Sequence, residues 1–105
     1  MTLRPVVFHP GVEDDLASIY EHYEAFDSSL PGRFEARLDD QVERIEMFPE
    51  SGAVLFEPYR RVLLKRFPYM AVYVVRNDRI DVLAVIGVRR DPESIEAAVS
   101  GRGDE

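Results

Sequence analysis

The chain has 105 residues, of which 46% are hydrophobic and 31% are charged, and this length and composition suit one globular domain with a single core. It contains no cysteine, which excludes disulfide bonds and zinc sites built on thiolates. The net charge of -7 argues against a nucleic-acid-binding protein, because phosphate binding depends on cationic side chains.

The charge is unevenly distributed along the chain. Residues 1–59 carry four basic and thirteen acidic side chains, residues 60–90 eight basic and two acidic, and residues 91–105 one basic and five acidic. This asymmetry predicts either two surfaces for two kinds of partner, or two blocks that attract each other within the fold. No apolar stretch is long enough to span a bilayer or to serve as a secretion signal, so we expect a cytoplasmic protein with no membrane partner.

The N-terminal half is predicted to form a short strand at residues 5–8 and then two amphipathic helices. Pro10 followed by three acidic residues is typical of a helix N-terminus. Apolar residues then recur at helical spacing, at Val12, Leu16, Ile19, Tyr20 and Tyr23. Turn residues from Asp27 to Pro31 precede a second stripe that ends before Pro49 and consists of Phe34, Leu38, Val42 and Ile45. The two helices should form an antiparallel hairpin.

The C-terminal half is predicted to be extended. After a loop at residues 49–58, runs rich in Val, Ile, Leu and Tyr predict three antiparallel strands at residues 60–65, 70–76 and 79–86. Alternation in the middle strand separates Tyr69, Ala71, Tyr73 and Val75 from Met70, Val72 and Val74, so one face should pack on the helices.

A short helix is expected from Pro92 to Val99, and residues 100–105 are expected to be a disordered tail. The predicted fold class is α+β, with the N-terminal helical hairpin packed on a small, mainly antiparallel sheet. Residues 1–99 are expected to form a single domain.

The basic residues suggest one candidate surface. Arg60 and Arg61 open one strand, and Arg89 and Arg90 follow the last, so strand pairing is expected to bring them together at the rim of the sheet. Such a patch can hold phosphates or an acidic protein surface, or it can serve only to discourage edge-to-edge aggregation. On the second helix, arginines lie three or four residues from acids and predict a partly ion-paired, solvated face; they are Arg33, Arg37 and Arg44.

The sequence identifies no catalytic residue, metal site or cofactor. The chain has two histidines: His9 precedes a helix-opening proline, and His22 lies on the first helix, remote in sequence from the basic patch. Their number and separation predict no metal site. There is no glycine-rich phosphate loop, no nucleophile elbow and no zinc spacing, and we expect no cofactor.

Several segments taken in order resemble the RelE/ParE superfamily of bacterial toxins. They are Phe8-His9-Pro10 through Asp15-Leu16, Phe48-Pro49, Arg66-Phe67-Pro68-Tyr69 leading into Val72-Tyr73, and Val82–Ile86 followed by Arg89-Arg90-Asp91-Pro92. The similarity covers roughly residues 5 to 95. It implies the toxin of a type II toxin-antitoxin pair, with a β-α-α-β-β-β fold and a partner antitoxin encoded beside it.

The superfamily has two well-known activities. RelE-like members cleave messenger RNA on the ribosome, and ParE-like members poison DNA gyrase. Ribonuclease members similar to this chain tend to carry a base in the middle strand and a histidine at the end of the last, where this chain has Met70 and Gly87. We therefore expect a ParE-like gyrase-binding toxin; the alternatives are a RelE-like mRNA endoribonuclease and a non-toxic protein that keeps the fold and only binds a partner. Whether the chain is an enzyme stays open.

The resemblance also implies two binding surfaces. Candidates for target binding are Arg60, Arg61, Lys65, Tyr73, Arg89 and Arg90. An antitoxin segment that orders on binding is expected to lay a helix or strand across the helical hairpin and the sheet, bringing basic residues to the acidic hairpin and acidic residues to Arg60, Arg61 and Arg89. Its candidate contacts on the hairpin are Leu16, Ile19, Tyr20, Tyr23, Asp39, Glu43 and Glu46. The two proteins are expected to form a hetero-oligomer.

Overall fold

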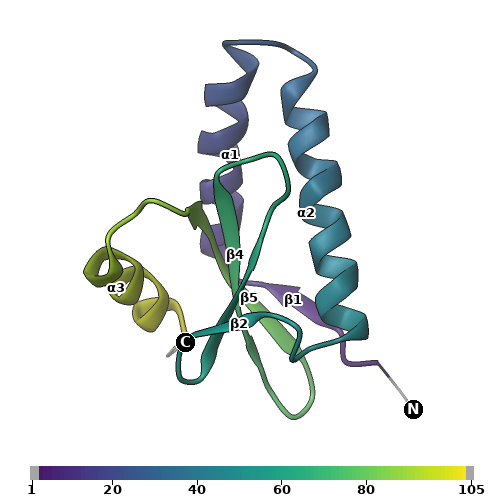
Figure 1. Ribbon diagram of the computed structural model, residues 1–105, viewed down its shortest axis with the longest axis vertical. Helices are drawn as coiled ribbons and strands as arrows, with labels where there is room; N and C mark the ends of the chain where they lie inside the picture. The colour runs from purple at the N-terminus through teal and green to yellow at the C-terminus, as the bar shows by residue number, and fades with distance from the viewer. Residues whose placement is uncertain (1–2, 104–105) are drawn as a thin grey trace.

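The computed structural model, which describes residues 3–103, contains a five-stranded mixed sheet (Figure 1). Its strands lie in the order β1-β5-β4-β3-β2. They comprise β1 (Val6–Phe8), β2 (Ala53–Phe56), β3 (Tyr59–Leu63), β4 (Tyr69–Val75) and β5 (Ile80–Gly87). β1 pairs in parallel with β5 and the other pairs are antiparallel, so the prediction of an α+β fold with a mainly antiparallel sheet is confirmed.

Three helices accompany the sheet: α1 (Pro10–Glu24), α2 (Leu30–Met47) and α3 (Pro92–Gly103). α1 begins as its sequence predicts, with Pro10 in the first turn and the His9 Nδ1 atom accepting a hydrogen bond from the amide of Gly11 at 2.9 Å. The turn before α2 is held by the Asp27 carboxylate, which accepts hydrogen bonds from the amide and hydroxyl of Ser29 at 2.8 Å each. α1 and α2 project beyond the sheet as the predicted hairpin (Figure 1).

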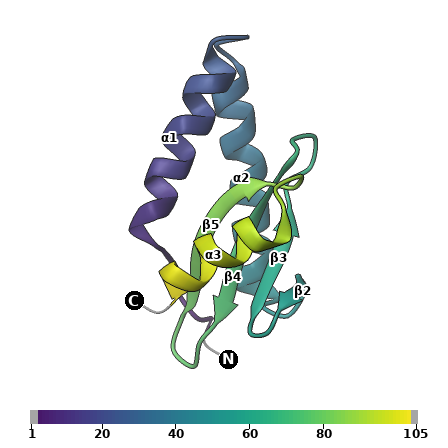
Figure 2. The ribbon, with the colours of Figure 1, turned by 90° about the vertical axis from the view of Figure 1, so that its left-hand side faces the viewer.

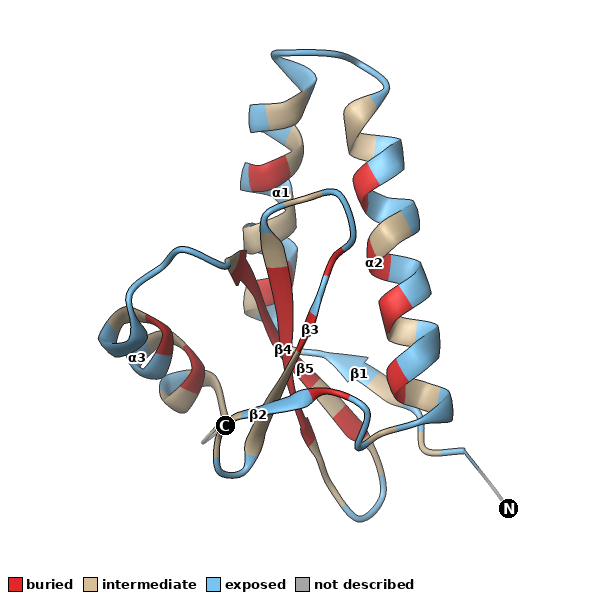
Figure 3. Cartoon of the chain, viewed as in Figure 1, coloured by how far each residue is buried: buried red, intermediate tan, exposed pale blue. Residues whose placement is uncertain are grey.

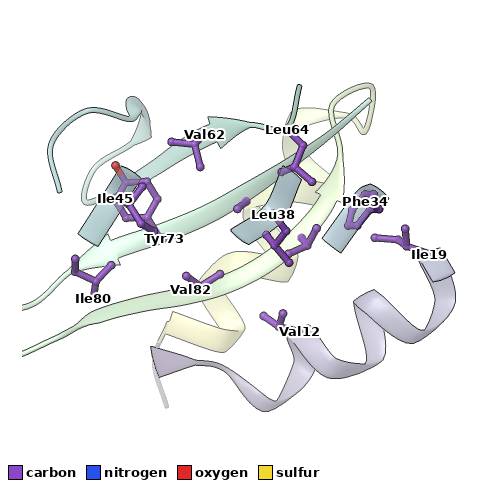
Figure 4. Close-up of a cluster of buried hydrophobic side chains, with 12 residues drawn as sticks. Val12, Ile19, Phe34, Leu38, Ile45, Val62, Leu64, Tyr73, Ile80 and Val82 are labelled. Atoms are coloured by element: carbon purple, nitrogen blue, oxygen red, sulfur yellow. The ribbon is translucent and has the colours of Figure 1, made fainter. Parts of the chain in front are cut away.

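Hydrophobic layers cover both faces of the sheet. The hairpin packs on one face, where Phe34, Ile45 and Tyr73 are fully buried (Figure 4). α3 lies across the other face (Figure 2) and buries Ile95 and Val99 against Met70, Val72 and Val74. The predicted alternation of β4 is therefore confirmed, and the sheet is buried on both sides because the C-terminal helix covers the face that the hairpin leaves free.

A bulge interrupts β5 and shifts its alternation. Val72 of β4 faces Ala84, but the next residue, Tyr73, faces Val82, so Leu83 is the extra residue. Leu83 and Ala84 both belong to the layer under α3, and Val85 returns to the layer under the hairpin. The bulge lies where β1 ends. There the backbone carbonyl of Leu83 and the amide of Val85 are hydrogen-bonded by the side chains of Arg102 and Asp15.

Two predictions about loops were wrong. β2 lies within the predicted loop at residues 49–58, and it is held by pairing with β3 at Ala53–Arg61 and Val54–Arg60. Residues 100–103 are not disordered but form the last turn of α3, because Arg102 bonds to Asp15 and Leu83 and the carbonyl of Gly103 accepts a hydrogen bond from Arg76 at 3.0 Å. Residues 104 and 105, the rest of the predicted tail, lie outside the described residues.

Within residues 3–103, no helix is both long enough and apolar enough to cross a membrane.

Candidate functional site

The surface of α2 carries opposite charges on opposite sides of its buried face. The buried face contains Phe34, Leu38, Gln41 and Ile45. At about 100° per residue, the acidic residues Glu35, Asp39, Glu43 and Glu46 follow one flank of the helix, and Arg33, Arg37 and Arg44 follow the opposite flank. In the described part of the chain none of these three arginines forms an ion pair, so the predicted ion-paired face is wrong.

The acidic flank borders a groove between α1 and α2, here called the acidic groove. It has a volume of about 330 Å³, and its lining includes apolar Phe8, Leu16, Tyr20 and Leu38 together with the carboxylates of Glu13, Glu35 and Asp39. Three of the predicted antitoxin contacts, Leu16, Tyr20 and Asp39, therefore lie together. Periodicity alone missed Phe8 and Glu35, since the groove needs residues from both helices and from β1.

The pKa of Tyr20 reflects the negative charge around the acidic groove. Its ring packs edge-on against Phe34 with 5.9 Å between centroids. Burial raises the pKa of the Tyr20 hydroxyl, and the negative charges of Glu35 and Asp39 raise it further. The groove is therefore an apolar trough with a negative rim, a surface that suits an amphipathic segment with basic flanks.

One predicted antitoxin contact, Ile19, belongs to the interior, and another, Tyr23, is half-buried against it. Ile19 is only 6% exposed and forms part of the core under the hairpin. Tyr23 packs into an aromatic cluster with Phe34, Phe67 and Tyr69, at centroid distances of 5.1–6.2 Å within the cluster. Glu43 is exposed and Glu46 is half-buried, and neither lines the acidic groove. Figure 3 shows the alternation of buried and exposed residues along both helices.

The predicted basic patch does not form as one unit. Because β3 and β5 each run antiparallel to β4, the start of β3 lies at the end of the sheet opposite Arg89 and Arg90. Arg60 faces Tyr73 and donates from Nη1 to the carbonyls of Glu50 at 3.2 Å and Gly52 at 2.8 Å. Lys65 follows the other end of β3, on the same side as Arg89 and Arg90, and all three are exposed.

Tyr73 is a structural residue and not a target contact, which corrects the prediction. It is fully buried, its hydroxyl donates to the carbonyl of Pro49 at 2.7 Å, and it accepts from the amide of Gly52 at 2.9 Å. Burial raises the pKa of this hydroxyl, which keeps it protonated at neutral pH. It therefore cannot serve as a surface contact or as a base.

Some of the basic residues neutralise acids within the fold. Arg76 and Arg79 both bind Asp81, at 3.1 and 2.8 Å, beside the β4–β5 turn. Arg102 binds the carboxylate of Asp15 through two nitrogens, at 2.7 and 3.0 Å, and also donates to the carbonyl of Leu83 at 2.9 Å. Asp15 in turn accepts from the amide of Val85 at 3.1 Å. This pair satisfies the edge of β5 where β1 ends, and no local pattern predicts it because Asp15 and Arg102 are 87 residues apart.

Both histidines are engaged within the fold. His9 caps α1, and His22 packs against the rings of Tyr23 and Phe26. Met70 is 2% exposed and lies under α3, while Gly87 closes β5. Among residues 3–103 no three His, Cys, Asp or Glu side chains are grouped so that they can hold a metal ion. The arrangement supports binding better than it supports proton transfer.

Comparisons of sequence identify one family, and a comparison of structures supports its fold. Residues 6–92 match the model of the "ParE toxin of type II toxin-antitoxin system, parDE". The chain is 35% identical over 100 residues to Toxin ParE2 from two strains of Mycobacterium tuberculosis, covering 94% of this chain and 95% of the relative. It also matches a chain of the solved chromosomal ParDE toxin-antitoxin system from P. aeruginosa, with a TM-score of 0.71 and 20% identity over 81% of this chain and 96% of that one.

Proposed function

Because this chain belongs to the ParE toxin family of type II toxin-antitoxin systems, we propose that it acts in the cytoplasm by binding DNA gyrase and is neutralised by a cognate antitoxin. The observation that supports a binding function over a nuclease one is that both imidazoles are engaged within the fold, His9 as the cap of α1 and His22 against the rings of Tyr23 and Phe26. RNA cleavage through the 2′-hydroxyl requires a proton acceptor beside the phosphate.

A pair of assays with purified components tests the target. We expect the chain to block ATP-dependent supercoiling of a relaxed plasmid by gyrase, and to leave messenger RNA intact on programmed ribosomes. Cleavage of mRNA without an effect on gyrase is the result that contradicts the proposal. Inactivity in both assays, together with harmless expression in a bacterial host, identifies a protein that keeps the fold and only binds a partner.

We assign the acidic groove to the antitoxin. A helix with an apolar stripe and basic flanks matches its apolar lining at Leu16, Tyr20 and Leu38 and its negative rim at Glu35 and Asp39. The affinity of such a complex has an electrostatic part that weakens as salt screens the charges.

Neutralising the rim tests this assignment. The double variant Glu35→Gln/Asp39→Asn should bind the protein encoded beside the toxin gene about tenfold more weakly at low salt, since each charge-assisted contact is worth on the order of 1 kcal/mol. The control is Glu21→Gln/Glu24→Gln, which removes two exposed charges from α1 outside the groove. Equal affinities of the two variants, measured by calorimetry, would place the antitoxin elsewhere.

A further inference from the structure

The two most exposed large apolar side chains within residues 3–103 lie at opposite ends of α2. Phe26, in the turn between α1 and α2, is 74% exposed, and Phe48, which follows the last residue of α2, is 64% exposed. At 1.5 Å per residue, the 18 residues of α2 hold these two ends about 27 Å apart (Figure 1). Neither end can therefore cover the other within one molecule.

The end of the hairpin that carries Phe26, residues 21–33, is here called the tip. Its turn is ordered, since the amides of Phe26 and Asp27 both donate to the carbonyl of Tyr23 at 3.0 Å and the Asp27 carboxylate binds Ser29. The exposed charged side chains of the tip are Glu21, Glu24, Asp27 and Arg33. The tip therefore presents a fixed aromatic ring in a mainly negative setting, and little order has to be gained when it binds.

A hollow of about 820 Å³, here called the basal hollow, lies at the other end of α2 and has a mainly apolar lining. The lining includes Met47, which is 53% exposed, Phe48 and Pro49. The loop below it is anchored, because the Phe48 amide donates to the carbonyl of Arg44 at 2.8 Å and the Pro49 carbonyl accepts from the hydroxyl of Tyr73 at 2.7 Å. The charged side chains of the hollow are Arg4, Arg44 and Glu50. The hollow is therefore preformed.

The two arginines of the basal hollow are not neutralised within the fold. Among residues 3–103 neither forms an ion pair, and Arg4 donates only to the uncharged carbonyl of Asn77, at 3.4 Å. Phenylalanine, methionine and arginine are enriched at the centres of protein interfaces, and clustered exposed apolar side chains mark such sites. The basal hollow thus has the composition of a protein-binding surface.

The tip and the basal hollow complement each other in shape and in charge. A projecting ring with three acids and one base around it matches an apolar hollow with two bases and one acid. A symmetric contact between two hollows would place arginines against arginines, and a contact between two tips would place acids against acids. The charges therefore favour a contact between the tip of one molecule and the hollow of another.

We propose that the chain associates with itself head to tail: the tip of one copy enters the basal hollow of the next, with Phe26 against Met47 and Phe48. Each copy has one tip and one hollow, so the contact repeats and builds open chains or closed rings. One aromatic anchor makes a small interface, and we expect a dissociation constant on the order of 100 µM. This association requires neither gyrase nor the antitoxin, so it can fail independently of the proposed function.

Sedimentation velocity of the purified full chain, from about 10 µM to about 1 mM, tests the proposal. The mean mass of the wild type should increase with concentration and pass that of a dimer. Phe26→Ser alters the tip and Phe48→Glu alters the hollow, and each variant should stay monomeric. Both side chains are exposed, so neither variant should lose the fold. Leu63→Ser removes a side chain that is 51% exposed outside both surfaces, and it should associate like the wild type.

An equimolar mixture of the two variants distinguishes a head-to-tail contact from a symmetric one. Phe26→Ser keeps an intact hollow and Phe48→Glu keeps an intact tip, so the mixture should form a dimer and nothing larger. Association of either variant alone, or a mixture that stays monomeric, would overturn the proposal. A wild type that stays monomeric at every concentration would overturn it as well.

The charges of the basal hollow supply a third measurement. The double variant Arg4→Gln/Arg44→Gln should associate about tenfold more weakly, because it removes both cations that face the acids of the tip. Lys65→Gln/Arg89→Gln is the matched control: it changes the net charge equally at exposed positions outside the hollow and should associate like the wild type. Equal weakening of both variants would show an effect of net charge alone and would contradict the pairing of tip and hollow.

Discussion

The hydroxyl of Tyr73 joins the loop after α2 to the centre of the sheet. It bridges the carbonyl of Pro49 and the amide of Gly52, two backbone groups that otherwise have to be satisfied by water. The sequence places Tyr73 correctly on the face toward the helices, but periodicity does not reveal whether a tyrosine ends at the surface or beneath a loop. The prediction of Tyr73 as a target contact rests on its strand face alone, and the loop that covers it makes that prediction wrong.

Replacing Tyr73 with phenylalanine should lower the free energy of unfolding at pH 7 by about 1–2 kcal/mol, because the Gly52 amide loses its buried acceptor. The pKa of the hydroxyl is raised in the folded state, so its stabilising effect is present below the unfolded value near 10 and is lost as the pH rises through the folded value. The difference between wild type and variant should therefore narrow above pH 10. Urea unfolding from pH 7 to 11 tests this, and a constant difference contradicts it.

Gly52 is required because other atoms occupy the space of a side chain. A Cβ atom there would overlap the hydroxyl of Tyr73 and lie 2.7 Å from the carbonyl oxygen of Arg61. We expect Gly52→Ala to destabilise the protein by about 2 kcal/mol or more, since the backbone of β3 must move. Gly32→Ala is the matched control: no atom lies within 4 Å of its added Cβ, and alanine should stabilise α2 by about 0.5–1 kcal/mol. Thermal unfolding of the two variants should shift in opposite directions.

At the scale of elements, α3 and its attachment decide whether the sheet has an exposed apolar face. α3 covers Met70, Val72, Val74 and Ile86. Its last turn is fixed by the Arg102–Asp15 pair, which links α3 to α1 and, through Leu83 and Val85, to the bulge of β5. Sequence periodicity predicted the start of this helix but not its end, because the partner of Arg102 lies 87 residues away.

The variant Arg102→Met keeps the length of the side chain and removes its charge. It should lower the free energy of unfolding by about 1–3 kcal/mol, because the half-buried Asp15 carboxylate and the Leu83 carbonyl lose their donor. Arg89→Met, at an exposed position, should change stability by less than about 0.5 kcal/mol. Chemical denaturation of both variants provides the comparison, and equal effects would show that the pair does not hold α3.

The helices and the central strands could be predicted because apolar residues recur along each of them with the period of a helix or of a strand. The short strand β2 could not, since Ala53–Phe56 is only four residues long and depends on pairing with β3. The acidic groove was predicted only in part, because its residues come from several elements: Phe8 from β1 and Glu35 from α2 meet there.

For the whole molecule, the division into an acidic hairpin and a basic sheet is too simple. The boundary between the charges runs along α2, with the acidic groove on one flank and Arg33, Arg37 and Arg44 on the other. The predicted attraction between residues 1–59 and residues 60–90 does not take the form of ion pairs within the described chain: Arg76 and Arg79 pair with acids of their own block, and Asp15 pairs with Arg102 of the C-terminal block. Counting charges along the sequence does not predict this division, because residues that are neighbours in the sequence lie on different sides of a helix.

The central claim is that this chain is a ParE-family toxin that acts on gyrase. Induction of the chain in a bacterial host, with DNA-damage signalling and the rate of protein synthesis followed separately over the first minutes, tests it most directly. We predict that DNA-damage signalling rises while translation continues, and that co-expression of the antitoxin abolishes the response. Prompt arrest of translation without DNA damage would contradict the claim.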